Sequence, residues 1–169
     1  MHEGKALENK PAGENKPVSG LTAHEVLKNL SGMEIFQKMI DGELPMPPFA
    51  ETLDYRIVEM EEGRVVFGGK PKVEYSNPLG TIHGGYIATL LDSAMACAVH
   101  TTLEAGKGCT SLEFKISFIR PVFEATGFVR AEGKIINVGK QIATAEGRLT
   151  DENGKIYAHG TQTLMIFGL

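Results

Sequence analysis

The residues best suited to chemistry lie in one segment, Asn77 to Asp92, at the start of an apolar helix pattern. His83 stands just before two glycines, Gly84 and Gly85, and Asp92 follows about two turns inside the helix. The first N–H groups of a helix lack an intrahelical acceptor, so these glycine amides could bind a carbonyl oxygen that gains negative charge. An ionised carboxylate in an apolar helix is costly unless it is paired. Asp92 could act as a nucleophile or as a general base toward water.

Each of these residues also has a purely structural interpretation. Asp92 could bond a neighbouring strand, and the two glycines could simply relieve a tight turn into the helix. His83 could hold the loop or orient a carbonyl group, and Asn77 before Pro78 forms a common turn pair. Tyr86 is either a packing residue or part of the lining of a nearby cleft.

Hydroxyl and basic side chains further along the chain could complete such a site. Ser111 begins the strand pattern after the helix, beside Thr110, and either hydroxyl could bond the carboxylate or an attacking water. Arg120 and Lys140 could bind phosphate groups, although most such side chains are simply solvated. The sequence contains no His-Glu-x-x-His or paired-cysteine site, no Gly-x-Ser-x-Gly elbow and no phosphate-binding glycine loop. We therefore expect neither a metal nor a redox cofactor.

The composition is that of an ordinary globular protein, with 42% of the 169 residues apolar and 22% charged. The net charge of −4 gives no electrostatic reason to expect a nucleic acid partner. Cys97 and Cys109 lack metal-ligand spacing and are too few for a disulfide framework. Because no apolar run is long enough to span a membrane and the N-terminus has no apolar signal segment, we expect a cytoplasmic protein with no membrane partner.

Hydrophobic periodicity predicts an α+β fold. A long helix pattern covers residues 84–103. Strand patterns before and after it cover residues 53–60, 64–72, 109–119, 126–137, 141–150 and 155–167. Glu61-Glu62-Gly63 and Asn153-Gly154 have the composition of hairpin turns. Since one helix cannot cover both faces of a parallel sheet, the hairpins predict an antiparallel sheet with the long helix on its apolar side.

The N-terminal region divides into several parts. Residues 1–20 are polar and are predicted to be a flexible tail, which leaves residues 21–169 as a single domain. Thr22 to Glu25 and Ser31 to Glu34 have the pattern of capping boxes for two short helices. Asp41-Gly42 is expected to end the second helix. An extended connection is predicted next, at the prolines Pro45, Pro47 and Pro48.

Two motifs carry a family resemblance. The first joins the turn, the helix start and the carboxylate, and reads Asn77-Pro78-x-Gly80-Thr81-x-His83-Gly84-Gly85 followed by Thr89-Leu90-Leu91-Asp92. The second is the strand Thr110-x-Leu112-x-Phe114-x-Ile116-x-Phe118-x-Arg120-Pro121. Together they resemble the hotdog-fold acyl-CoA thioesterases of the phenylacetate-degradation (PaaI-like) family, from about residue 31 to residue 167.

The resemblance implies a hotdog fold, in which a curved antiparallel sheet wraps around one long helix. It implies hydrolysis of acyl-CoA, either aryl or medium-chain, to a free acid and coenzyme A, with no cofactor beyond the coenzyme A of the substrate. It also implies a homodimer whose sheets join edge to edge, usually paired into a homotetramer. Each active site at the dimer interface would take the helix start from one subunit and the carboxylate from the other.

The resemblance assigns roles by position. Gly84 would donate to the thioester carbonyl, and Asp92 would be the nucleophile or general base. The residues expected to be catalytic are Asp92, Gly84, His83, Asn77 and Ser111. The residues expected to bind substrate are Gly85, Tyr86, Thr110, Arg120 and Lys140, with the last two at the nucleotide end of coenzyme A.

Two other functions are known for the same fold. A non-catalytic acyl-CoA-binding or sensing module is disfavoured by the retained carboxylate and by the lack of an obvious DNA-binding segment. An enoyl-thioester hydratase would need a His/Asp or His/Glu pair around the alkenoyl carbons, which His83 and Asp92 could supply by spacing alone. The identity of the acyl group and the choice between dimer and tetramer stay open.

Overall fold

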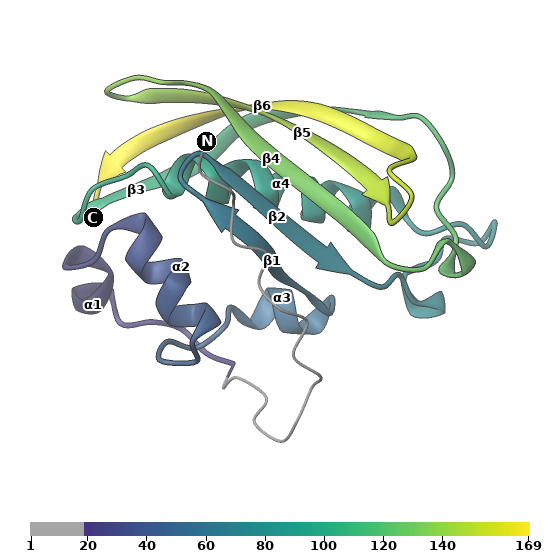
Figure 1. Ribbon diagram of the computed structural model, residues 1–169, viewed down its shortest axis with the longest axis horizontal. Helices are drawn as coiled ribbons and strands as arrows, with labels where there is room; N and C mark the ends of the chain where they lie inside the picture. Colours follow the sequence, from purple (N-terminus) through teal and green to yellow (C-terminus); the bar gives the residue numbers. More distant parts are fainter. Residues whose placement is uncertain (1–18) are drawn as a thin grey trace.

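The structure is a computed structural model that describes residues 19–169. One six-stranded antiparallel sheet, in the order β1-β2-β4-β5-β6-β3, curves around the long helix α4 (Figure 1). Its elements are β1 (Tyr55–Glu61), β2 (Arg64–Gly69), β3 (Lys107–Phe118), β4 (Val129–Val138), β5 (Ile142–Asp151), β6 (Ile156–Gly168) and α4 (Gly84–His100). The predicted α+β architecture is confirmed, and α4 ends at His100 rather than at residue 103.

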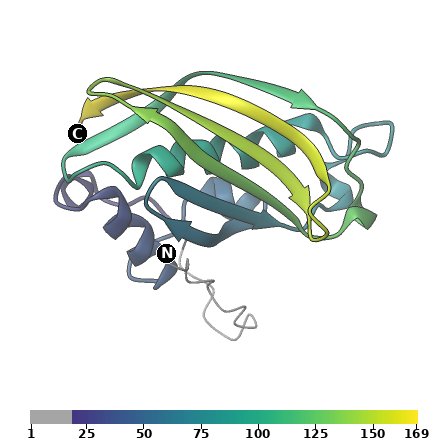
Figure 2. The same cartoon turned by 45° about the horizontal axis from the view of Figure 1, so that its top comes forward.

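The core lies between α4 and the face of the sheet that wraps around it (Figure 2). On α4, Leu90, Leu91 and Met95 have no exposed surface, and on the sheet Leu149 and Leu164 are equally buried. Burying a side chain of this size contributes about 1.5–3 kcal/mol to stability. Tertiary packing of this kind, more than helix propensity, holds α4 in place.

Glycines at tight turns confirm two of the predicted hairpins. Gly63 joins β1 to β2 with φ of 77°, and Gly154 lies between β5 and β6 with φ of 78°. These values fall in the left-handed region, which glycine adopts without steric cost. The hairpins fix the register of β1 against β2 and of β5 against β6.

Short helices pack beside the sheet (Figure 1). They are α1 (His24–Lys28), α2 (Gly32–Ile40), α3 (Pro48–Thr52) and the 3₁₀ turns η1 (Val73–Tyr75) and η2 (Glu124–Thr126). The capping box predicted for α2 is confirmed, because Ser31 and Glu34 each bond the other's main-chain N–H. The one predicted for α1 is wrong, since that helix is capped at Ala23 without any side-chain bond.

The proline-rich connection contains a helix, so the prediction of a wholly extended segment is wrong from Pro48 onward. Pro48 is the first residue of α3. Proline is tolerated there because the first N–H of a helix has no intrahelical acceptor and the fixed φ of proline suits the helix. The predicted tail lies outside the described residues except for Ser19 and Gly20, which pair with Met46. In residues 19–169 no helix combines the length and apolar character needed to cross a membrane.

Helix α2 packs closely against the end of α4. The N–H of Gly32 donates to the carbonyl of Leu103 at 3.0 Å, and a Cβ at position 32 would lie only 1.8 Å from the carbonyl oxygen of His100. Phe36 meets the His100 ring edge-on, with ring centroids 5.3 Å apart. Burial lowers the pKa of His100, and its Nε2 has no hydrogen-bond partner among the described residues.

This burial predicts that the protein loses stability on mild acidification. Because the pKa of His100 is lower in the folded state than its ordinary value of about 6.5, the unfolded chain takes up a proton first as the pH falls. Stability is therefore retained above about pH 6.5 and decreases below it. Urea unfolding midpoints measured from pH 7.5 to 5 should fall more steeply for the wild type than for His100→Gln. Equal slopes for the two proteins would contradict the expectation.

Strand β3 lies at the edge of the sheet, with β6 as its neighbour within the described chain. Phe114 and Phe118 pair across the ladder with Gln162 and Ala158, which are buried on the side facing α4. Both phenylalanines are nevertheless 41% and 56% exposed. A long apolar edge strand is a surface that proteins normally cover.

Candidate active site

The structure brings Asp92 and Ser111 together. Asp92 projects from the middle of α4 toward β3, and the hydroxyl of Ser111 donates to its Oδ1 atom at 2.9 Å. The next residue back, Thr110, is exposed and pairs with the exposed Met165. Of the two hydroxyls left open by the sequence, Ser111 is therefore the one that faces the carboxylate.

A third side chain, Gln162 on β6, completes this cluster and was missed by the sequence analysis. Its Nε2 group donates to Oδ1 of Asp92 and, at 2.7 Å, to Oγ of Ser111. Gln162 is 2% exposed, whereas Asp92 is half-buried. Gln162 lies in the polar run Thr161-Gln162-Thr163. Three polar residues in a row show no alternation, so the sequence did not indicate that the middle one faces inward.

The start of α4 presents a single unpartnered amide. His83 is the N-cap, and its Nδ1 accepts a hydrogen bond from the N–H of Gly85 at 2.9 Å. The N–H of Gly85 is therefore occupied in this structure, and its expected part in the amide site stays a prediction. The N–H of Gly84 donates to no group in residues 19–169. It stands at the positive end of the helix, where it can stabilise an oxygen that gains negative charge.

Gly84 and Asp92 of one chain do not share a site. They are eight positions apart on α4, which corresponds to about 12 Å along the helix. Gly84 instead lies under the end of β3, where a Cβ would come within 3.2 Å of the Phe118 ring. Within one chain, the amide of Gly84 and the carboxylate of Asp92 therefore lie apart, and both lie beside the edge strand β3.

Asn77 closes the loop that leads into α4. Its Oδ1 accepts from the N–H of Leu79 at 2.9 Å, and its Nδ2 donates to Thr81 Oγ1 at 2.7 Å. The main chain adds bonds from Asn77 to Thr81 and from His83 to Tyr75, each 2.8 Å. With both ends of its amide engaged, Asn77 shapes the loop and so places the start of the helix.

Tyr86 lies in the core, and its expected part in substrate binding stays a prediction. It is 4% exposed and stacks on Tyr75 with ring centroids 4.9 Å apart. Its hydroxyl points toward Gly69 on β2, away from β3, and burial raises its pKa. The two thiols are also poor candidates for a nucleophile, because burial raises the pKa of Cys109 to about 11 and that of Cys97 further.

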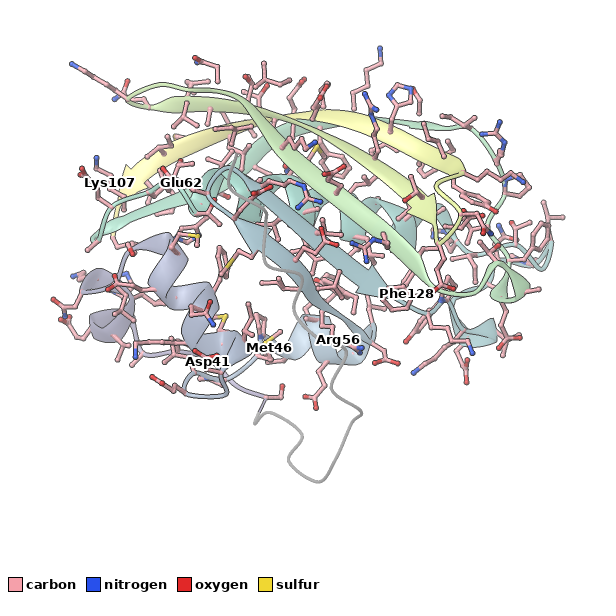
Figure 3. All side chains as sticks on the ribbon, viewed as in Figure 1. Asp41, Met46, Arg56, Glu62, Lys107 and Phe128 are labelled. Atoms are coloured by element: carbon pink, nitrogen blue, oxygen red, sulfur yellow. The ribbon has the colours of Figure 1, made fainter. Side chains whose placement is uncertain are left out.

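Arg120 and Lys140 lie at opposite ends of the molecule and cannot bind one nucleotide within a chain. Arg120 donates through Nη1 to the carbonyl of Ile156 at 2.5 Å, whereas Gln141, next to Lys140, accepts from the N–H of Ile166. Ten residues of β6 separate these points, or about 33 Å. Figure 3 shows the same two ends, marked by Lys107 and Phe128.

A cavity of about 390 Å³ opens at the Lys140 end. Leu103 and Ile166 are nearly buried at its floor, while Lys107 and Lys140 contribute amines. Lys107 is 3.4 Å from the carboxylate of Glu104, and no ion pair of Lys140 occurs among the described residues. The apolar residues and the two amines of this cavity together suit a ligand that carries an anionic group.

These features define a hotdog-fold protein with an unpartnered helix-start amide and a half-buried carboxylate on its long helix. A sequence model of the thioesterase superfamily matches residues 79–158. Human acyl-coenzyme A thioesterase 13 is 31% identical over 108 residues, which are 63% of this chain and 76% of that protein. The chain belongs to the thioesterase superfamily and is a thioester hydrolase.

Solved structures agree with this membership. The phenylacetic acid degradation-related protein of Ralstonia eutropha JMP134 is 31% identical, with a TM-score of 0.71 over 77% of this chain and 98% of that one. A Streptococcus mutans UA159 protein bound to acetyl CoA shares the fold, at 22% identity and a TM-score of 0.62 over 68% of this chain and 90% of that one. The expected hotdog fold and the PaaI-like resemblance are confirmed.

Proposed function

We propose that the protein hydrolyses acyl-CoA thioesters to a free acid and coenzyme A. The N–H of Gly84 polarises the thioester carbonyl, and the Asp92 carboxylate either attacks the carbonyl carbon or removes a proton from an attacking water. Ser111 can accept a hydrogen bond from that water while it donates to Asp92. The carbonyl–sulfur bond breaks, and the thiolate of coenzyme A leaves and takes up a proton. Where Asp92 has attacked, water then hydrolyses the acyl–Asp92 anhydride, which releases the free acid and restores the carboxylate.

One observation carries this proposal: the only donor left unpartnered at the start of α4 among residues 19–169 is the N–H of Gly84, on the same helix as Asp92. An unused amide at a helix start is suited to a developing oxyanion, and a carboxylate is suited to attack or proton removal. The acetyl CoA bound by the Streptococcus mutans neighbour and the name of the human relative support acyl-CoA as the substrate class.

The proposed active unit is a homodimer formed along β3. Among residues 19–169 no strand pairs with the outer edge of β3, and Phe114 and Phe118 are exposed on the same side as the amide and the carboxylate. A two-fold axis beside antiparallel edge strands brings opposite ends of two strands together. Gly84 of one subunit then meets Asp92 of the other, which overcomes their separation of about 12 Å within one helix.

Thiol release from a panel of aryl- and alkyl-CoA esters tests the proposal. Hydrolysis is expected for at least one acyl class, and the panel also identifies which acyl group the apolar residues of β3 accept. Tight binding of the esters without thiol release would favour an acyl-CoA-binding module instead. Hydration of an enoyl-CoA without thiol release would favour the hydratase.

The cavity at Lys140 is the proposed site for the phosphates of coenzyme A, in preference to Arg120, whose guanidinium already donates to Ile156. Replacing Lys140 by alanine should raise KM for a CoA ester about five-fold, the equivalent of about 1 kcal/mol for a partly exposed charge pair. The same variant should leave KM unchanged for the matching N-acetylcysteamine ester, which lacks phosphates. Lys155→Ala, at the other end of β6, is the control, and an equal effect on both esters would contradict the assignment.

Other features of the proposed enzyme follow the family resemblance. Hydrolysis requires no cofactor besides the coenzyme A of the substrate. Two dimers are expected to pair into a homotetramer, which sedimentation measurements can distinguish from a dimer. A cytoplasmic location remains our expectation, and the free thiols of Cys97 and Cys109 are compatible with it.

A further inference from the structure

We propose that Gln162 is a positioning residue of this hydrolase: it fixes Oδ1 of Asp92 and Oγ of Ser111, and so leaves Oδ2 of Asp92 as the reacting oxygen. The inference rests on the proposed function and adds a residue and an atomic assignment to it. Gln162 bonds neither the amide of Gly84 nor, in the proposed mechanism, the substrate, so it acts through the two side chains that it bonds.

The position of Gln162 is rigid. It lies on β6, a strand bonded on both sides, where it pairs with Phe114 of β3 and Ala145 of β5. Its side chain is buried and extends beneath the half-buried Asp92. A donor anchored in this way can hold a carboxylate in one orientation more firmly than an exposed side chain could.

Gln162 is not an ordinary buried polar residue whose groups are all satisfied. Thr101, the other polar residue fully buried in the described part of the chain, donates to Ala98 and accepts from Gly63. The Oε1 atom of Gln162 accepts no bond from the described residues, and both Nε2 bonds go to Asp92 and Ser111. A residue that leaves a buried acceptor unpaired breaks a rule of stable cores, as functional sites often do.

The orientation of the Gln162 amide follows from charge. Turned over, it would place Oε1 against the Asp92 carboxylate, so Nε2 must face the acid. The three bonds then form a closed ring, in which Oδ1 of Asp92 accepts from both Gln162 and Ser111. Oδ2 has no hydrogen-bond partner in residues 19–169 and keeps its lone pairs available for reaction.

Two substitutions test this role. Gln162→Leu removes both donors at similar volume and should lower kcat about 30- to 100-fold, because a small misplacement of a reacting group has effects of that size. KM should change less than about three-fold, since Gln162 makes no proposed contact with substrate. The control is Thr161→Val, the neighbouring residue on the exposed face of β6, which should keep wild-type kcat and KM.

Gln162→Glu provides a readout that a merely structural role would not produce. The new carboxyl keeps the shape of the side chain but can donate to Asp92 only while it is protonated. Activity of this variant should therefore fall as the pH rises through the ionisation of that carboxyl, which adds a descending limb absent from the wild-type profile. This variant also decides the question if Gln162→Leu fails to fold.

The outcomes separate the two proposals. Wild-type kcat in folded Gln162→Leu, or a wild-type pH profile in Gln162→Glu, would overturn the role of Gln162 while leaving the hydrolase intact. A wild-type protein that releases no thiol from any ester would overturn the proposed function, and the inference with it. A selective loss of kcat together with the added limb supports both.

Discussion

Replacement of Asp92 by asparagine is expected to lower kcat for thioester hydrolysis by about 10²- to 10⁴-fold, which is the usual contribution of a general base. Asparagine keeps the shape of the side chain, and its carbonyl oxygen can accept the bonds from Ser111 and Gln162. The loss then reflects the missing carboxylate and not a damaged cluster. Thiol release under saturating CoA ester measures it, and thermal unfolding checks that the fold is retained.

The neighbouring hydroxyl provides a matched control for this substitution. Ser93 is the next residue on α4 and meets Tyr55 at 3.0 Å on the side away from β3. Ser93→Ala should keep kcat within a few-fold of the wild type. Purified Asp92→Asn and Asp92→Ala proteins with full activity would rule out the mechanism proposed for this carboxylate.

Mixing two inactive variants should restore activity if each site is shared between subunits. Gly84→Pro removes the amide that polarises the carbonyl, and Asp92→Asn removes the carboxylate. In a dimer carrying one of each, both defects fall in one site and the other site is intact. After subunit exchange at equal amounts, random pairing in a two-fold dimer should give about a quarter of wild-type activity.

The local structure makes Gly84→Pro a fair test. Position 84 is the first residue of α4, where proline is favoured, and the extended conformation of His83 (ψ of 135°) is compatible with a following proline. Gly84→Ala is the control, because it brings the same Cβ toward Phe118 but keeps the N–H. If the mixture stays as inactive as its components, each site is built within one chain and the shared-site arrangement is wrong.

Local chemistry explains which parts of the fold could be predicted from the sequence. Gly63 and Gly154 mark turns because only a few residue types tolerate a positive φ, and Ser31 marks a helix start because its partner Glu34 follows three residues later. The same logic was misleading at Thr22, whose hydroxyl is buried without a partner among the described residues while Ala23 caps the helix. At Pro48, an alternative use of proline at the first helical position was overlooked.

The sequence predicted which segment carries the candidate site, but it did not predict which way each side chain of that segment points. Gly85 and Tyr86 lie beside Gly84 in the chain, yet a helix turns by about 100° per residue, so Tyr86 faces the core while Gly85 bonds back to His83. Gln162 comes from a strand far along the chain, and it reaches Asp92 only because β6 pairs with β3 in the sheet on which α4 packs. Long-range strand pairing of this kind leaves no local signal in the sequence.

Helix α4 has a consequence for how the proposed dimer responds to substrate. Its 17 residues pack against β2, β3, β4, β5 and β6, so its two ends belong to one packed element. In the proposed dimer, its first residue belongs to one active site and its ninth residue to the other. If filling one site shifts α4, the second site changes with it, and by linkage any such coupling is reciprocal. The dependence of the hydrolysis rate on substrate concentration then reflects how far the packing of α4 on the sheet allows the helix to shift.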